Sequence, residues 1–186
     1  MRILREQKMS SEGSEKKLAF KIILIGDPSV GKTSTIRRYS DNKFEQSYLP
    51  TIGADFNLKV VDMENLEIIL TIWDIGGHDR FSMIRNFYYQ GAHGGFLIFD
   101  ITRKETFENI KNWHQDLIKG ANAKIPAIII ANKADLQSEA KVTDEEINNL
   151  SKEMGLPWYK TSAKTGKNVD EAFNKIAELI VKDVSG

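Results

Sequence analysis

The stretch that decides the fold is "FKIILIGDPSVGKT" at residues 20–33. Its first half is a continuous run of mostly apolar residues, which is typical of a strand covered on both faces. Its second half, residues 26–33, satisfies the pattern G-x-x-x-x-G-K-[ST] and leads into a helical pattern. The glycines let the backbone curl so that several N–H groups point inward, and the helix adds the positive end of its dipole. This strand–loop–helix unit predicts a binding site for phosphate groups.

Two side chains of this loop have chemistry of their own. Lys32 can reach the outer phosphates of a nucleotide, and Thr33 can ligate Mg²⁺ through its hydroxyl. We therefore predict a magnesium–nucleoside triphosphate as the ligand. The residues of this loop that we expect to contact it are Asp27, Ser29, Val30, Gly31, Lys32, Thr33 and Ser34.

The same strand pattern recurs along the chain, with helical patterns between the strands. The further strand-like runs lie at 66–74, 94–100, 127–133 and 158–163. One helix is predicted over 105–119. Capping-box pairs predict three helix starts, namely Thr102 with Glu105, Thr143 with Glu146, and Asn168 with Glu171.

One segment, residues 53–74, breaks the alternation because it reads as two strands joined by a turn at 63–65, an antiparallel pair. We predict an α/β fold of the P-loop NTPase type. Its mostly parallel six-stranded sheet has one antiparallel edge strand and helices on both faces. Residues 1–17 are mostly polar and charged and are expected to form a flexible tail. The remainder, 18–186, is expected to be a single domain.

Composition excludes several classes of function. Lys+Arg and Asp+Glu are both 26, so no net charge favours a nucleic-acid partner. The chain has no Cys, which excludes disulfides, thiolate metal sites and Cys nucleophiles. No apolar run approaches the ~20 residues that span a bilayer, and we expect a cytoplasmic protein.

A second motif, NKAD at 132–135, follows a predicted strand at its carboxyl end, where open parallel sheets bind ligands. Asp135 can accept hydrogen bonds from N1–H and the amino group of guanine. Adenine lacks both donors and would leave the carboxylate unpaired. Asn132 can serve the opposite edge of the base, and the aliphatic stem of Lys133 can cover the ring. NKAD thus favours guanine and disfavours a P-loop ATPase or kinase.

A third motif, TSAK at 161–164, ends the next predicted strand. The backbone N–H of Ala163 can reach the guanine oxygen, and we include Ser162 and Lys164 in the predicted base site.

In this order, the three motifs are similar to those of the Ras superfamily of small GTPases, and the chain most closely resembles its Rab branch. The resemblance covers residues 20–182. The Rab-like segments are "IGADF" (52–56), "IWDIGGHDRF" (72–81), "YYQGA" (88–92) and "LIFDIT" (97–102). The resemblance implies one G domain over 18–186 that binds GTP or GDP with Mg²⁺.

The resemblance also implies roles for single residues. Phe44 would pack on the guanine, and Tyr48 could close over the phosphates. Thr51 would ligate Mg²⁺ through its hydroxyl and sense the γ-phosphate through its backbone. Asp74 would hold the metal, and the Gly77 N–H would contact the γ-phosphate. The predicted metal ligands are Thr33, Thr51 and Asp74.

Such contacts predict a molecular switch. Hydrolysis removes the γ-phosphate that Thr51 and Gly77 contact, so the segments 44–52 and 75–90 should loosen and change the surface they present. The expected partners are effectors, exchange factors and GTPase-activating proteins, and the resemblance suggests membrane trafficking. The resemblance also implies an aromatic triad shown to effectors, with core packing as the alternative: Phe56, Trp73 and Tyr88.

His78 departs from the family pattern, in which a Gln usually orients the attacking water. An imidazole can accept from water when neutral or stabilise phosphate charge when protonated, but its two nitrogens point apart. The pattern D-x-x-G-H resembles the loop of translational GTPases, where a partner makes the His productive. We assign catalytic roles to His78, Lys32 and Gly77 and predict slow hydrolysis that an activator accelerates. Pro28, where the family often has a small residue, could hinder that activator.

Alternatives to these assignments stay open. His78 could be a bystander, and the protein could be a GTP-binding interaction module with negligible hydrolysis. Rab-like proteins usually end in prenylated Cys, but this chain has none, and Arg2 stands where N-myristoylation requires Gly. Either the C-terminus is truncated or the protein works without a lipid anchor. We expect a monomer, with peripheral membrane association not indicated by any lipidation site.

Overall fold

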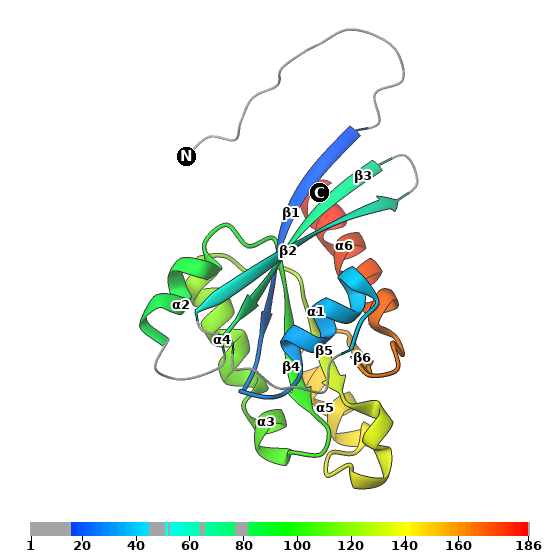
Figure 1. The fold of residues 1–186 in the computed structure, drawn as a ribbon. Coiled ribbons are helices and arrows are strands. Elements are labelled where there is room, and N and C mark those ends of the chain that lie inside the picture. Colours follow the sequence, from blue (N-terminus) through cyan, green and yellow to red (C-terminus); the bar gives the residue numbers. More distant parts are fainter. Residues whose placement is uncertain (1–15, 45–50, 52, 64–65, 77–81, 186) are drawn as a thin grey trace, which may run out of the picture.

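A computed structural model describes residues 16–44, 51, 53–63, 66–76 and 82–185. Six strands form one sheet in the order β2-β3-β1-β4-β5-β6. Strands β2 and β3 pair antiparallel, and the other pairs are parallel. The predicted fold class is therefore confirmed, with the antiparallel strand at one edge (Figure 1). The strands are β1 Lys16–Ile25, β2 Ala54–Met63, β3 Leu66–Ile75, β4 Gly94–Asp100, β5 Ala127–Asn132 and β6 Trp158–Lys160.

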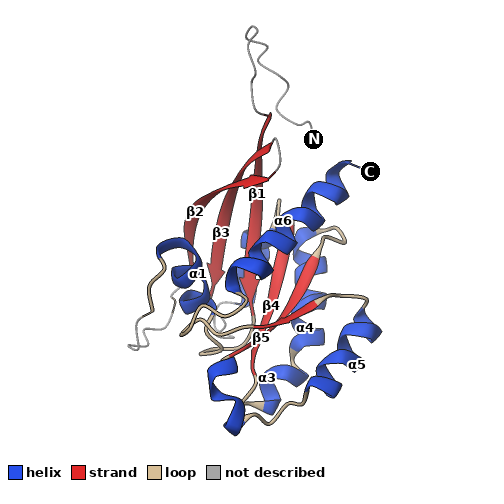
Figure 2. Cartoon of the chain, turned by 90° about the vertical axis from the view of Figure 1, so that its right-hand side faces the viewer, coloured by secondary structure: helices blue, strands red, loops and turns tan. Residues whose placement is uncertain are grey.

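Helices cover both faces of the sheet (Figure 2). Two of them, α1 and α6, pack on one face, and α2, α4 and α5 pack on the other. Within the described ranges, none of the helices is both long and apolar enough to cross a membrane. The helices are α1 Lys32–Asp41, α2 Ser82–Tyr89, α3 Lys104–Glu108, α4 Ile110–Ala121, α5 Asp144–Met154 and α6 Val169–Ser185, with a 3₁₀ segment η2 at Ala134–Glu139.

Strand β1 shows why the central strands are apolar without alternation. Ile22 and Leu24 pack in the core under α1 and α6, whereas Ile23 and Ile25 pack in the core on the opposite face. Both sets are buried, so each position needs an apolar side chain. The strand begins at Lys16, so the sheet includes the last two residues of the predicted tail.

The topology determines where a ligand can bind. Strands β1, β3, β4, β5 and β6 run in one direction, so their carboxyl ends meet at one edge of the sheet. The loop 26–31 follows β1, Asp74 lies near the end of β3, and residues 133–135 and 161–164 follow β5 and β6. All the predicted motifs therefore lie at the same edge, as ligand sites of open α/β sheets do.

The predicted capping box at Thr143 is confirmed. The hydroxyl of Thr143 accepts from the backbone N–H of Glu146 at 3.2 Å, and the backbone N–H of Thr143 donates to the Glu146 carboxylate at 2.9 Å. The other two capping boxes are wrong. Thr102 instead donates its hydroxyl to Asp100 at 2.7 Å, because a buried carboxylate is the stronger acceptor. Asn168 has a positive φ of 55°, which is not a capping conformation, and its amide donates to the Lys160 carbonyl at 2.8 Å.

The single helix predicted over 105–119 is also wrong. Helix α3 begins at Lys104, with Arg103 as its N-cap and no side-chain cap, and ends at Glu108. A second helix, α4, follows Asn109, whose side-chain amide donates to Asp27 at 2.9 Å. A tertiary contact to the loop 26–31 thus lies at the junction of the two helices.

Glu146 provides a test of how α5 is anchored. Its carboxylate forms an ion pair with Lys104 at the start of α3, and that partner, with Thr143, lowers the pKa of Glu146 from 4.5 to about 2. Since the folded pKa lies below the unfolded value, the stabilisation is fully present above pH 4.5 and is lost as the pH falls toward about 2. We expect Glu146→Gln to lower the free energy of unfolding at neutral pH, and the deficit to shrink on acidification through this window.

Denaturant titrations between pH 7 and the acid limit would measure this difference. Glu145→Gln, an exposed neighbour on the same helix, is the control for loss of one charge. A Glu146→Gln deficit that stays constant with pH would contradict the assignment.

Candidate nucleotide-binding site

The phosphate loop, residues 26–31, connects the end of β1 to the start of α1. Ser29 and Gly31 have positive φ angles of 64° and 100°. A Cβ at position 31 would lie 2.3 Å from Nδ2 of Asn132, so glycine leaves room for that side chain. Asn132 Nδ2 donates to the carbonyl of Val30 at 2.9 Å. The loop is therefore held against the end of β5.

Lys32 begins α1 and is 6% exposed. Its Nζ donates to the carbonyls of Gly26 at 2.8 Å and Asp27 at 3.0 Å. Burial lowers the pKa of Lys32 from 10.5 to about 8; the carboxylates of Asp74 and Asp27 oppose that shift, and the guanidinium of Arg85 adds to it. An anion at the loop would favour the protonated amine. Lys32 is thus a buried cation suited to phosphate oxygens.

The three predicted metal ligands meet, although they come from separate segments. Oδ2 of Asp74 accepts hydrogen bonds from Oγ1 of Thr33 and, at 3.0 Å, from Oγ1 of Thr51. The two hydroxyl oxygens lie 3.1 Å apart. Asp74 is 2% exposed, and within the described ranges its Oδ1 is buried without a hydrogen-bond partner. Hydroxyl and carboxylate oxygens are hard donors, so these residues fit Mg²⁺.

No competing metal site is found in the described part of the chain. There, no group of three or more His, Cys, Asp or Glu side chains is arranged to hold an ion. A metal at the Thr33–Thr51–Asp74 cluster would have a single protein carboxylate, which is the arrangement expected when phosphate oxygens and water complete the coordination of Mg²⁺.

Asn132, at the end of β5, is 1% exposed and uses both ends of its amide within the protein. Besides its bond to Val30, its Oδ1 accepts from the hydroxyl of Thr161 at 3.2 Å and from the backbone N–H of Ala163 at 3.3 Å. One side chain therefore connects the phosphate loop with the loop after β6, and the predicted contact of Asn132 with a base stays a prediction.

The other predicted base ligands lie around Asp135. Its Oδ1 accepts from the hydroxyl of Ser162 at 2.6 Å, and its Oδ2 lies 4.0 Å from Nζ of Lys164. Lys133 has a positive φ of 68°, and its Nζ pairs with the buried carboxylate of Asp100 at 2.6 Å. Residues 132–135 and 161–164 thus lie together in one polar cluster, and their predicted contacts with guanine stay predictions.

The remaining predicted ligands are less informative. Ser29 is exposed, whereas Ser34 and Phe44 are half-buried at the two ends of α1. Tyr48, Gly77 and His78 lie outside the described residues, so their predicted contacts with nucleotide stay predictions.

The sequence prediction missed the hydrogen bonds that hold the carboxylate of Asp27 within the protein. Oδ1 accepts from Nε1 of Trp113 at 2.7 Å, and Oδ2 accepts from Nδ2 of Asn109 at 2.9 Å. Arg103 also reaches the loop, donating from Nη1 to the carbonyl of Pro28 at 2.9 Å. No local pattern identifies these contacts, because they join residues that are 75 to 86 positions apart.

Arg38, on α1, was also missed. Its Nε donates to the carbonyl of Ala163 at 2.8 Å, and its Nη2 donates to that of Lys164 at 2.7 Å. Nη1 donates to the carbonyl and side chain of Asn42 at 3.1 and 3.0 Å. The guanidinium therefore fixes backbone carbonyls of the loop after β6, whereas Asn132 accepts from the Ala163 N–H of the same loop.

The predicted aromatic triad is contiguous. The ring centroids of Phe56 and Trp73 lie 5.6 Å apart, and those of Trp73 and Tyr88 lie 6.2 Å apart. Phe56 is 57% exposed, while the other two are half-buried. The sequence allowed either an exposed triad or core packing, and the structure combines the two. Phe56 is exposed, whereas Trp73 and Tyr88 are partly packed.

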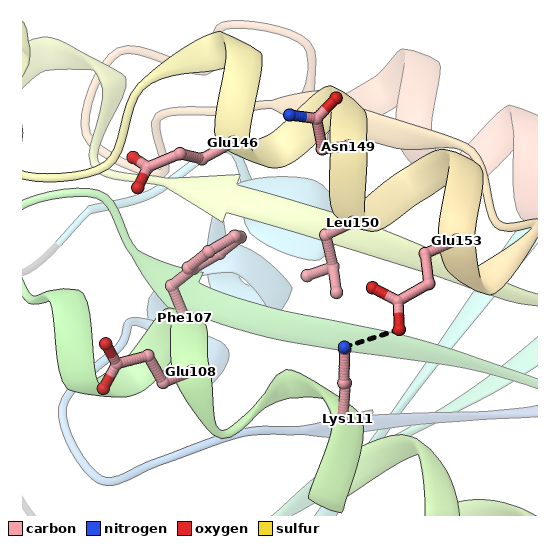
Figure 3. A pocket seen from close by; sticks show the side chains of 7 residues that line it. All are labelled: Phe107, Glu108, Lys111, Glu146, Asn149, Leu150 and Glu153. Atoms are coloured by element: carbon pink, nitrogen blue, oxygen red, sulfur yellow. Dashed lines mark hydrogen bonds and ion pairs between the residues drawn. The ribbon is translucent and has the colours of Figure 1, made fainter.

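A separate hollow of about 390 Å³ lies between α3, α4 and α5. Phe107 and Leu150 line it, and Lys111 and Glu153 form an ion pair across one side (Figure 3). None of the predicted nucleotide or metal ligands lines this hollow. It is therefore not part of the site at the edge of the sheet.

A phosphate loop between a central parallel strand and a helix, with a polar base cluster two strands away, defines a P-loop nucleotide-binding protein. Comparison with known proteins narrows that class, because the model of the Ras family matches residues 21–182. The chain belongs to the Ras family of small GTPases.

Similar proteins lie in the Rab branch of that family. Ras-related protein Rab-13 of Bos taurus is 41% identical over 167 residues, which are 90% of this chain and 82% of that protein. GTP-binding protein YPTM1 of Zea mays is 39% identical over 90% of this chain and 80% of its own length. Ras-related protein Rab-15 of Mus musculus is 37% identical over 88% and 77%. The chain is thus a small GTPase of the Rab branch.

We expect Arg38→Ala to accelerate dissociation of bound guanine nucleotide about tenfold, because the loop at 161–166 loses two charge-assisted hydrogen bonds. Release of a fluorescent GDP analogue would measure the rate. Lys182→Ala, an exposed cation on α6, is the control for loss of one positive charge. Equal dissociation rates for Arg38→Ala and wild type would mean that the loop needs no support from α1.

Proposed function

We propose that this protein is a guanine-nucleotide-dependent switch that binds GTP and GDP with Mg²⁺ and hydrolyses GTP slowly, with stimulation by a partner. The observation that carries the proposal is the meeting of Thr33 and Thr51 on the buried carboxylate of Asp74. Thr51 belongs to the segment between α1 and β2, and its hydroxyl contacts the candidate metal site. A change at the phosphates can therefore change the position of that segment.

Each residue of the site has a chemical task in this proposal. Thr33, Thr51 and Asp74 would hold Mg²⁺, which when bound offsets the negative charge of the phosphates. Lys32 supplies a second positive charge from the first turn of α1, where the helix dipole has the same sign. Gly77 is proposed to donate its N–H to the γ-phosphate.

Guanine selectivity is assigned to Asp135. Its Oδ1 is oriented by Ser162, and a carboxylate can accept from both N1–H and the amino group of guanine. Phe44 and the stem of Lys133 are proposed to cover the ring faces, with the backbone N–H of Ala163 near the guanine oxygen. Adenine would leave the carboxylate without donors, so ATP should compete poorly with GTP.

Asp135→Asn tests the base assignment. Guanine presents two donors, N1–H and the amino group, and the Asn amide offers them only one acceptor because its NH2 group is itself a donor. The affinity for GDP should therefore fall at least ~100-fold. Xanthosine diphosphate, which has a carbonyl in place of the amino group, should gain affinity. Competition against a fluorescent nucleotide, with Mg²⁺ and with a chelator, would measure both. Asp170→Asn, exposed in the first turn of α6, is the control. Tighter binding of ATP than GTP by wild type would overturn the proposal.

Hydrolysis is assigned to water held by His78. We expect single-turnover hydrolysis by wild type to be slow and that of His78→Ala to be about tenfold slower or more, because a positioned acid–base group typically contributes at least that much. His78→Gln would report whether the usual family residue restores rate. Phosphate release, with and without Rab-directed activating domains, is the measurement.

Equal rates for wild type and His78→Ala, alone and with activator, would remove His78 from the mechanism. Undetectable turnover under all conditions would instead favour a GTP-binding interaction module that does not complete the cycle.

Regulation and location extend the same proposal. We infer that effectors, exchange factors and activating proteins bind the segments 44–52 and 75–90 together with the triad Phe56, Trp73 and Tyr88. The exposure of Phe56 and its contact with Trp73 support a docking surface there. We propose a cytoplasmic monomer that acts in membrane trafficking, since the similar proteins belong to the Rab branch.

A further inference from the structure

Trp113, on α4, is 8% exposed and makes contacts in two directions. Its Nε1 donates to Oδ1 of Asp27 in the phosphate loop at 2.7 Å. Asn109, one helical turn earlier, donates to the other carboxylate oxygen at 2.9 Å. Because Trp113 lies on α4 and Asn109 is the N-cap of that helix, the start of α4 fixes the orientation of the Asp27 carboxylate. The phosphate loop is thereby attached to a helix that none of the nucleotide motifs includes.

The face of the Trp113 ring is contacted by Arg85 from α2. The guanidinium carbon lies 4.6 Å from the ring centroid, a distance at which a cation is attracted by the ring quadrupole. Arg85 is 6% exposed, and its Nη1 is buried with no hydrogen-bond partner among the residues that the structure describes. Because a buried cation is shielded from water, it is stabilised mainly by the protein groups around it, and one of these is the Trp113 ring.

Helix α2 also packs closely on α4 one turn further along. A Cβ at Gly120 would lie 2.2 Å from Cδ2 of Tyr89, so the absence of a side chain at position 120 allows this approach. Arg85 and Tyr89 thus present one face of α2 to α4. A shift of α2 would have to move the guanidinium across the indole face.

The contacts continue to the cation of the phosphate site. Asp27, whose carboxylate Trp113 fixes, accepts at its carbonyl from Nζ of Lys32 at 3.0 Å. Helix α2 lies within the segment 75–90, which is proposed to respond to the γ-phosphate, and only a triphosphate carries that group. A link from α2 to the phosphate loop can therefore act on the preference between triphosphate and diphosphate.

We propose that Trp113 is a positioning residue that couples helix α2 to the phosphate loop, and that with Arg85 it determines how strongly the protein prefers a nucleoside triphosphate to a diphosphate. The inference rests on the proposed binding of guanine nucleotides. The indole is rigid, so its N–H edge and its ring face keep one relative orientation. Movement of α2 therefore changes the position of the Asp27 carboxylate. By linkage, a change in the bound phosphates changes the position that α2 prefers.

The experiment measures the dissociation constants of GDP and of a non-hydrolysable GTP analogue at fixed Mg²⁺ and takes their ratio. Trp113→Phe keeps a ring and removes the N–H, whereas Arg85→Met keeps a long apolar side chain and removes the charge. We expect each to reduce the preference for the triphosphate about tenfold, within the usual range of coupling between sites. Arg85→Lys should retain most of the preference for the triphosphate. The double variant Trp113→Phe, Arg85→Met should lose less of this preference than the sum of the two single losses.

Trp158→Phe is the matched control. Trp158 also donates its Nε1 to a side chain, Asn148 Oδ1 at 2.9 Å, but it lies on β6 and α5 supplies its partner. Its removal should leave the ratio unchanged. Loss of affinity for both nucleotides by the same factor in Trp113→Phe would indicate a structural role alone and would overturn the proposal, as would an unchanged ratio.

A spectroscopic measurement keeps the proposal testable if Trp113→Phe does not fold. The chain has three Trp residues, so the double variant Trp73→Phe, Trp158→Phe leaves Trp113 alone. We expect its emission to differ between the GDP-bound and analogue-bound states, and identical spectra would overturn the coupling. Absence of any guanine-nucleotide binding by wild type would instead remove the proposed function, which separates the two failures.

Discussion

One buried amide, that of Asn132, holds the ligand-binding edge of this fold together. It joins the phosphate loop through Val30 to the loop after β6 through Thr161 and Ala163. The contact requires glycine at position 31, because any Cβ there would occupy the space of the amide nitrogen. Loss of the amide would remove a partner from the Val30 carbonyl, the Thr161 hydroxyl and the Ala163 N–H, and a buried polar group left unpaired costs roughly 1–3 kcal/mol. The relative placement of the phosphate and base motifs therefore depends on this side chain.

The phosphate loop is preorganised by tertiary hydrogen bonds. Among the hydrogen bonds of the described residues, Thr51 is attached only through its hydroxyl. Helix α4 holds the carboxylate of Asp27, Arg103 holds the carbonyl of Pro28, and Asn132 holds that of Val30. Such a loop needs little reorganisation to accept phosphates. Thr51, by contrast, meets the side chains of Thr33 and Asp74. A preorganised phosphate loop beside a hydroxyl contact from a separate segment is a physical basis for a switch, since a ligand can change that contact without deforming the loop.

The helix starts show how far local sequence patterns reach. The pair Thr143 and Glu146 forms its capping box, in which the Thr143 hydroxyl accepts from the backbone N–H of Glu146. Thr102 has the same local pattern, yet Asp100 takes its hydroxyl, and the helix begins at Lys104. Asn168 likewise donates to the Lys160 carbonyl. The capping-box pattern indicates which hydrogen bonds a side chain is able to form. For Thr102 and Asn168, a group at the end of a neighbouring strand is the partner instead.

The sequence by itself determined the antiparallel pair at the edge of the sheet and the strand–loop–helix unit with Lys32 and Thr33, because these follow from hydrophobic periodicity and motif spacing. The assignment of Thr51 and Asp74 to the same metal site came from the resemblance to the Ras superfamily. Only the tertiary structure decided the destinations of Asp27, Arg38, Arg85 and Trp113. Their contacts join residues far apart in the chain, as with the 125 positions between Arg38 and Ala163. No local periodicity encodes such pairs, since the packing of the elements decides which of the many possible partners each polar group reaches.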